Sequence, residues 1–225
     1  MVYRQNERST RVREASRARM LAAARRLFAR RGFEATTMRQ IAAAARTSIG
    51  NLYFYFASKE ELLETLMAEA REPLWAWIDR AIATVPPGAT RLAIVLYANA
   101  VGLLAADRAL THMLLRESGR PELADRVARP YWERMRAHIR ENFPGYPEAD
   151  LDLAAAAWTG AGRSCIERAV AGDLPGDPLE LAAFLARWNL RGLGVSDPDI
   201  DEALAGAATI IAELGPPVRE REPRR

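Results

Sequence analysis

The sequence predicts an all-α protein, and three observations predict it. Apolar residues recur with a period near 3.6 along almost the whole chain, and no stretch alternates with a period of two over the length of a strand. Proline and glycine cluster where these periodic stretches end, as at 86–88 and 175–178. A length of 225 residues, an apolar content of 49% and a charged content of 27% are ordinary for a globular protein of one or two domains.

The composition argues against several classes of protein. No apolar run approaches the roughly 20 residues that a membrane span needs. The first 19 residues are polar and rich in arginine, unlike a secretory signal. Cys165 is the single cysteine, so we expect no intramolecular disulfide and no cysteine-based metal cluster. We therefore expect a cytoplasmic protein with no metal and no other cofactor.

Charge is distributed unevenly along the chain. Residues 1–60 hold 13 basic and 4 acidic residues, a net charge of +9, whereas the whole chain has a net charge of +3. The other 165 residues therefore have a net charge of −6. This asymmetry predicts a polyanion-binding module joined to a part that does not bind polyanions. The alternative is a basic face that is merely solvated.

The first elements are expected to be one long and two short helices. The first helix covers 15–31 and ends at Gly32, a residue favoured after a helix C-terminus. The second begins with a capping box formed by Thr37 and Gln40. Arg46-Thr47 interrupts the pattern, and Thr47 or Ser48 can cap the third helix. The expected core positions are Leu27, Phe28, Ile41, Ala45, Leu52 and Phe56.

Two short helices after a longer basic helix have the outline of a helix-turn-helix. A second capping box, Ser58 with Glu61, opens the long helix that follows. The helices beyond the first three are expected at 58–84, 90–106, 107–117, 121–141, 148–171, 179–193 and 200–214. The polar tail at 216–225 is expected to be disordered.

The residues of the helix pair make the outline specific. They are Leu27-Phe28, Gly32-Phe33, Thr36-Thr37-Met38, Ile41-Ala42, Ala45, Ser48, Gly50-Asn51-Leu52-Tyr53-Phe54-Tyr55-Phe56, Ser58-Lys59-Glu60 and Leu62. Over about residues 14–74 the chain closely resembles the DNA-binding domain of the TetR family. The resemblance implies a DNA-binding domain there, with its helix-turn-helix at about 37–56, and a ligand-binding and dimerisation domain at 75–215. The chain departs from the family in the turn, where Arg46-Thr47 replaces the usual Gly-Val, so Arg46 must adopt the turn without the freedom of glycine.

In this interpretation the third helix is the recognition helix, with its N-terminal end in the major groove. Gly50 permits close approach to DNA, Asn51 can pair with adenine, and Ile49 can touch a thymine methyl group. Helix N-termini and hydroxyl groups suit phosphates. The expected DNA contacts are Thr36, Thr37, Ser48, Ile49, Gly50, Asn51, Tyr53, Tyr55 and Lys59.

Alternatives stay open for several of these residues. Ile49 has an equally good interpretation as a core residue, because it lies three positions before Leu52. Thr37 can be a cap alone, and Tyr53 can be an ordinary core side chain. Four N-terminal arginines form either an arm along the DNA backbone or a solvated helix start: Arg11, Arg13, Arg17 and Arg19.

Lys59 is the only lysine of the chain, beside 31 arginines. It falls in the first turn of a helix, where a positive charge is unfavourable for the helix dipole. A nearby DNA phosphate explains this placement best.

The C-terminal part contains apolar helix faces but no recognisable motif. Helices 148–171 and 179–193 are the best candidates for a four-helix bundle across a twofold axis, although the same faces can be intramolecular core and 200–214 can replace either helix. The candidate dimer residues are Ala155, Gly162, Cys165, Phe184, Leu185 and Trp188. Aromatic and flexible side chains on the middle helices suit an apolar or aromatic ligand. The candidate ligand residues are Trp75, Tyr97, Met113, Tyr131, Trp132, Met135 and Trp158.

These features together predict a homodimeric regulator that binds a double-stranded DNA operator and is released from it by a small molecule. A corepressor-dependent or ligand-independent DNA-binding regulator is the alternative. An enzyme is disfavoured, because residues 160–164 resemble a phosphate-binding loop only superficially and are expected to be helical. His112 and His138 can hydrogen-bond a ligand, but they are better interpreted as surface or internally hydrogen-bonded histidines.

Overall fold

The computed structural model describes residues 2–104, 117, 128–174 and 177–215, and within these ranges the chain is helical and contains no β-strand. The expected all-α fold is confirmed. The chain divides into two compact units, Met1–Glu69 and Ala70–Arg225, which we call the N-terminal unit and the C-terminal unit. Helix α4, Lys59–Ile82, begins in the first unit and continues into the second.

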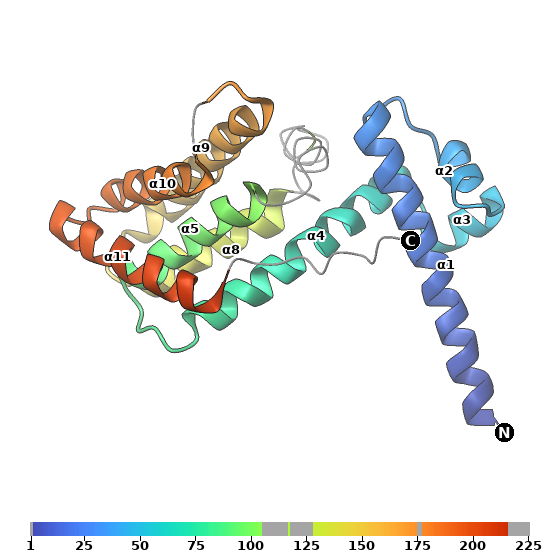
Figure 1. The fold of residues 1–225 in the computed structure, drawn as a ribbon, viewed down its shortest axis with the longest axis horizontal. Helices are drawn as coiled ribbons and strands as arrows, with labels where there is room; N and C mark the ends of the chain where they lie inside the picture. The colour runs from blue at the N-terminus through green and yellow to red at the C-terminus, as the bar shows by residue number, and fades with distance from the viewer. Residues whose placement is uncertain (1, 105–116, 118–127, 175–176, 216–225) are drawn as a thin grey trace. The chain divides into compact units, whose positions relative to one another are not determined.

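The N-terminal unit contains α1 (Val2–Arg31), α2 (Met38–Ala44), α3 (Ile49–Tyr55) and the start of α4. Figure 1 shows α2 and α3 side by side, next to α1. Helix α1 begins earlier than the expected residue 15 and ends as expected at Gly32, whose φ of 81° places it in the left-handed region.

The core of this unit consists of the positions that the helical period selects. Phe28, Ile41, Leu52 and Phe56 are fully buried or nearly so, and Ala45 is buried with them. Leu27 is half-buried rather than buried. Burial of each large side chain contributes about 1.5–3 kcal/mol, so this face fixes how α1, α2 and α3 pack.

The C-terminal unit is arranged around α5. Its described helices are the end of α4, α5 (Ala89–Leu104), α8 (Arg129–Asn142), α9 (Leu151–Ala171), α10 (Pro178–Gly192) and α11 (Asp197–Leu214), with a short 3₁₀ helix at Glu148–Asp150. Helix α5 packs against α8, α9, α10 and α11 and lies among them in Figure 1. Its buried run Leu92–Leu96 explains this central position.

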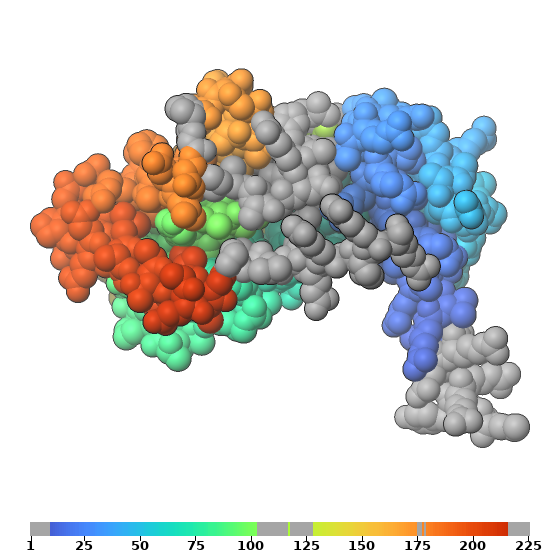
Figure 2. Space-filling view, in the orientation of Figure 1, coloured from blue at the N-terminus to red at the C-terminus, as the bar shows by residue number. Residues whose placement is uncertain are grey.

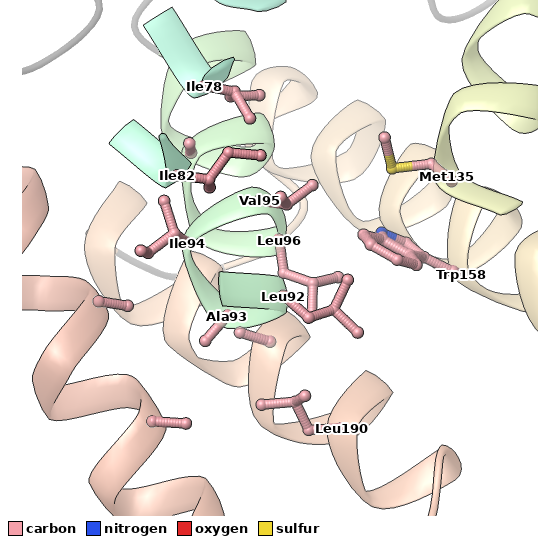
Figure 3. Close-up of a cluster of buried hydrophobic side chains, with 14 of the residues drawn as sticks. Ile78, Ile82, Leu92, Ala93, Ile94, Val95, Leu96, Met135, Trp158 and Leu190 are labelled. Carbon is pink, nitrogen blue, oxygen red and sulfur yellow. The ribbon is translucent and has the colours of Figure 1, made fainter. Parts of the chain in front are cut away.

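The core around α5 draws side chains from several helices (Figure 3). Ile78 comes from α4, Met135 from α8, Trp158 from α9 and Leu190 from α10. In the close-up Met135 and Trp158 are neighbours, across from the side chains of α5. None of the described helices is both long enough and apolar enough to cross a membrane.

Helix ends follow local chemistry. Ser196 caps α11 by accepting a hydrogen bond from the Asp199 N–H, so this helix begins at Asp197 rather than at the expected residue 200. Gly172, with φ 91°, ends α9 after Ala171, as expected. The helix expected at 107–117 and the start of the one expected at 121–141 fall almost wholly outside the described residues, as does the tail at 216–225.

Candidate functional site

The start of α2 is built by the capping box that the sequence predicts. The Gln40 N–H donates to Thr37 Oγ1 at 3.3 Å, and the Thr37 N–H donates to Gln40 Oε1 at 3.0 Å. Thr37 is exposed, so its capping role leaves it available to a ligand at this helix end. Thr36 is different: it is 1% exposed and its hydroxyl donates to the Gly32 carbonyl oxygen at 2.8 Å. The expected phosphate contact of the Thr36 hydroxyl is therefore corrected to an internal hydrogen bond.

The turn between α2 and α3 is a Schellman motif with arginine in the left-handed position. Arg46 has φ 53°, and it is the one non-glycine residue with positive φ among those described. The Arg46 N–H donates to the Ala43 oxygen at 3.1 Å, and the Thr47 N–H donates to the Ala42 oxygen at 3.0 Å. These bonds satisfy carbonyl groups that the end of a helix leaves free. Arg46 thus adopts the turn that the sequence requires of it, at a steric cost that glycine avoids.

Helix α3 presents one face to the core and another to solvent. Ser48 caps it by accepting from the Asn51 N–H at 3.1 Å, and Leu52 points into the core. Ile49 is 40% exposed, so the outward alternative holds for this residue. Tyr53 is 51% exposed and therefore is not an ordinary core side chain.

Two residues of the exposed face have distinct environments. A Cβ atom added to Gly50 would meet nothing within 4 Å, so no packing contact in the described chain requires glycine there. Asn51 is exposed, and its Nδ2 donates to Thr47 Oγ1 at 2.8 Å. The hydroxyl of Thr47, one of the two turn residues, thus orients the side-chain amide of Asn51. Nδ2 keeps a second hydrogen and Oδ1 accepts, which is the pair that adenine recognition uses.

Lys59 has an internal role that the sequence did not reveal. Its Nζ donates to the Phe33 carbonyl oxygen at 2.9 Å and lies 4.2 Å from the centroid of the Phe33 ring. These contacts connect the start of α4 to the segment between α1 and α2. They explain the position of the lysine at the start of a helix, so the inference of a DNA phosphate from that position is corrected. A phosphate contact would use the remaining hydrogens of the ammonium group.

The N-terminal arginines fall into two groups. Arg17 donates to Glu69 Oε1 at 2.8 Å, and its guanidinium lies 5.6 Å from the centroid of the Phe56 ring. Arg17 is therefore tied to α4 and the core. Arg11, Arg13 and Arg19 are exposed on α1, and the Arg19 guanidinium donates to the Ser16 hydroxyl at 3.2 Å.

The candidate ligand residues separate by burial. Met135 and Trp158 are enclosed in the α5 core, and this packing accounts for them without a ligand. The half-buried aromatic candidates that pack against the core are Trp75, Tyr97, Tyr131 and Trp132. Burial raises the pKa of the Tyr97 and Tyr131 hydroxyls, and Asp177 raises that of Tyr97 further. Met113 and His112 lie outside the described residues.

His138 contradicts the expectation of a surface or satisfied histidine. It is buried on α8, and neither ring nitrogen has a hydrogen-bond partner among the described residues. Burial and then Arg134 lower its pKa to about 4, Asp79 opposes this shift, and Arg91 adds to it less strongly. The imidazole is therefore neutral at pH 7.

The candidate dimer residues also separate. Ala155 and Leu185 are buried within their own chain, which corrects them to intramolecular core. Gly162 is half-buried, and Cys165 is half-buried against a small cluster of α5, α9 and α10 side chains. Phe184 is 59% exposed and Trp188 48% exposed, one helical turn apart on α10. Figure 2 shows α9 and α10, in orange, at the surface of the C-terminal unit.

Comparison with known proteins addresses the N-terminal unit most directly. Residues 20–66 match the family model for bacterial regulatory proteins of the tetR family. The HTH-type transcriptional repressor KstR2 of Mycobacterium tuberculosis is 47% identical over 51 residues, which are 23% of this chain and 26% of that protein. The HTH-type transcriptional regulator UidR of Escherichia coli is 37% identical over 57 residues, 25% of this chain and 29% of that protein. Residues 20–66 therefore belong to the TetR family of regulatory proteins.

The likeness to solved structures extends over both units. The structure of RolR with resorcinol has a TM-score of 0.64 and 24% identity, and the alignment covers 87% of this chain and 96% of that one. FadR of Bacillus subtilis with stearoyl-CoA has a TM-score of 0.60 and 22% identity, over 78% of this chain and 98% of that one. At this identity the likeness concerns the fold. The sequence alignment spans only about a quarter of the curated relatives, so it concerns their DNA-binding domain.

The sequence did not single out one exposed residue of α3. Phe54 is 71% exposed, and its ring contacts that of Tyr55 edge-on at 5.4 Å between centroids. Phe54 lies four residues after Gly50, so the signal was available as helical spacing.

Proposed function

We propose that this chain is a sequence-specific DNA-binding transcriptional regulator that leaves its operator when a small molecule binds the C-terminal unit. The observation that carries the proposal is the exposed face of α3. Ile49, Gly50, Asn51 and Tyr53 are solvent-accessible there, and the open space at Gly50 gives no packing reason for a glycine. A glycine inside a helix costs roughly 0.5–1 kcal/mol relative to alanine, so close approach of a DNA surface is the better explanation.

The charge of the N-terminal unit supports a polyanion as the partner. Residues 1–60 have a net charge of +9, and Arg11, Arg13 and Arg39 are exposed. Contacts of such side chains with phosphates supply affinity without sequence preference, while Asn51 and Ile49 supply the base contacts. Thr37, Ser48, Tyr53, Tyr55 and Lys59 complete the proposed set of DNA-contacting residues.

We place the homodimer interface on α9 and α10. The exposed apolar side chains of these helices include Leu153, Phe184 and Trp188. Two such helices from each of two chains form a four-helix bundle, and twofold symmetry then presents two recognition helices to an operator with inverted half-sites.

Selection of a duplex from a random DNA library, followed by fluorescence anisotropy, tests the DNA-binding part of the proposal. Gly50→Ala is expected to leave the free energy of unfolding equal or higher, because alanine favours helix, and to weaken the selected duplex at least tenfold. Asn51→Ala should alter the preference among base-substituted duplexes. Gly145→Ala is the matched control, since a Cβ there also meets nothing within 4 Å and the residue lies in a loop of the C-terminal unit.

Failure to select any duplex, or an unchanged affinity of Gly50→Ala, would refute the proposed interface. If a duplex were selected only in the presence of an added metabolite, the protein would be a corepressor-dependent regulator rather than one released by its ligand.

A further inference from the structure

Two helical stripes of the C-terminal unit concentrate positive charge around one aromatic ring. On α4, Arg71, Trp75 and Asp79 follow each other at intervals of four residues, and on α8, Arg134 and His138 do the same. The guanidinium carbon of Arg134 lies 4.7 Å from the Trp75 ring centroid, and that of Arg71 lies 5.3 Å from it. The two stripes therefore meet at Trp75.

The acidic partners in this region are peripheral. Asp79 accepts from the Arg134 guanidinium at 2.5 Å, yet its side chain is 57% exposed whereas that of Arg134 is 24% exposed. On α5, Arg91 pairs with Glu141 at 2.9 Å, and the Glu141 side chain is also about half exposed. An ion pair with such an exposed member contributes little, roughly 0–1 kcal/mol. Another carboxylate can therefore replace Asp79 on Arg134 at small cost.

Several buried donors beside these pairs lack an acceptor within the part of the chain that the structure describes. They are the Trp75 Nε1, the Arg134 Nε and the Arg91 Nε, and His138 adds two unpartnered ring nitrogens. A buried donor without an acceptor costs about 1–3 kcal/mol, and more where the group is charged. At His138, burial and then the charge of Arg134 lower the pKa, while Asp79 raises it and Arg91 lowers it less strongly.

We propose that Arg134, with Trp75 and His138, forms a subsite for the carboxylate of the effector. The effector is then a small carboxylic acid with an apolar body, its carboxylate accepting from the Arg134 guanidinium in place of Asp79 and its body lying against the half-buried Tyr131, three residues before Arg134 on the same helix face. No covalent step is involved. This inference rests on the proposed function, because it names the chemical class of the molecule that the C-terminal unit senses.

Isothermal titration calorimetry with matched acid and amide probes tests the subsite. The probes are benzoate with benzamide, and octanoate with octanamide, titrated into the full-length protein. At least one acid is expected to bind ten times more tightly than its amide. Arg134→Gln should remove this preference, and Asp79→Asn should increase the affinity for the acid several-fold, because it removes the competing carboxylate. Damage to the fold would not produce that gain.

Arg140→Gln is the control, since Arg140 lies on the same helix but is paired with Glu148 at the surface. Absence of binding by both acids up to millimolar concentration, equal binding of acids and amides, or a preserved preference in Arg134→Gln would overturn the inference. Anisotropy with the selected duplex runs in parallel. Normal duplex binding without any acid preference refutes the subsite alone, whereas acid preference without duplex binding refutes the proposed function alone.

Discussion

Arg46 shows how a single residue can carry conformational strain at the turn between α2 and α3. A residue with a Cβ in the left-handed region costs roughly 1–2 kcal/mol, and Arg46 adopts φ 53° because the two Schellman hydrogen bonds hold it there. We expect Arg46→Gly to raise the free energy of unfolding by about 0.5–1 kcal/mol, the gain being reduced by the greater freedom of glycine in the unfolded chain. Urea denaturation measures this.

The matched control is Arg39→Gly, at an exposed position inside α2. Glycine there should lower the free energy of unfolding by up to about 1 kcal/mol. A loss of stability in both variants would show that the Arg46 side chain contributes more than its backbone strain costs.

His138 links stability to pH. In the folded chain its pKa is lowered to about 4 by burial and by the charges of Arg134 and Arg91, with Asp79 opposing them, whereas the unfolded chain has the ordinary value near 6.5. Between these values the unfolded chain binds a proton that the folded chain excludes, so the free energy of unfolding falls as the pH drops from 6.5 toward 4. Its contribution is fully present above pH 6.5, and the total loss is about 3 kcal/mol.

His138→Gln removes the titrating group, so urea denaturation at pH 7.5, 5.5 and 4.5 should show a weaker pH dependence in the variant than in the parent. Carboxylates titrate in both proteins, so their contributions cancel when the pH profile of the variant is subtracted from that of the parent. Identical pH profiles would assign the acid sensitivity to groups other than His138.

At the scale of the element, sequence patterns defined caps and buried faces better than helix starts. The capping box at Thr37 and Gln40 and the stop at Gly32 are local chemistry, so the sequence alone predicted both. The second box was only half right: Ser58 accepts from the Glu61 N–H, but Glu61 accepts from the Ala57 N–H instead of that of Ser58. The start of α1 was missed because residues 4–11 are all polar, so the sequence shows no apolar period there.

The roles of exposed and buried polar side chains were less predictable. The sequence cannot show that Lys59 reaches the Phe33 carbonyl, 26 residues away, or that Thr36 turns inward to Gly32. These contacts depend on tertiary packing rather than on helical period. The same limitation explains why Ala155 and Leu185 were expected at the dimer interface. Two apolar faces of one helix look equivalent in the sequence until their neighbours are known.

Helix α10 contains the residue with which the proposed dimer interface can be tested. Trp188→Glu is expected to raise the dimer dissociation constant at least 100-fold, because a buried carboxylate would replace an aromatic anchor at the proposed interface. The monomer should stay folded, since Trp188 is 48% exposed in the single chain. Sedimentation velocity across a concentration series measures this.

Leu214→Glu is the control, because Leu214 is equally exposed but lies at the end of α11. If both substitutions left the dimer intact, or if Leu214→Glu alone disrupted it, the interface would have to be placed elsewhere.

At the scale of the whole molecule, α4 is the continuous element shared by both units. It contains Lys59 at its start and Trp75 farther along, so a ligand that displaces α4 acts on both units through one helix. Any such coupling is reciprocal. A compound that releases the selected duplex should itself bind more weakly when that duplex is present, by the same factor, typically about 5–150-fold.

Calorimetric titration of that compound with and without saturating duplex measures the factor. Equal affinities would exclude coupling between the sites, and tighter binding on DNA would identify a corepressor.

The hydrogen bond between Lys59 and Phe33 also makes the reactivity of Lys59 a measure of local opening in the N-terminal unit. Lys59 supplies the only side-chain amine in the sequence, and its nitrogen is engaged by a backbone oxygen and an aromatic face. An acylating reagent can consume this amine only after the contact opens. When the contact closes again faster than the reagent reacts, Lys59 is acylated more slowly than a free lysine, and the ratio of the two rates gives the opening equilibrium at this point of the N-terminal unit. Mass spectrometry of the peptide around Lys59 then follows local opening without any substitution.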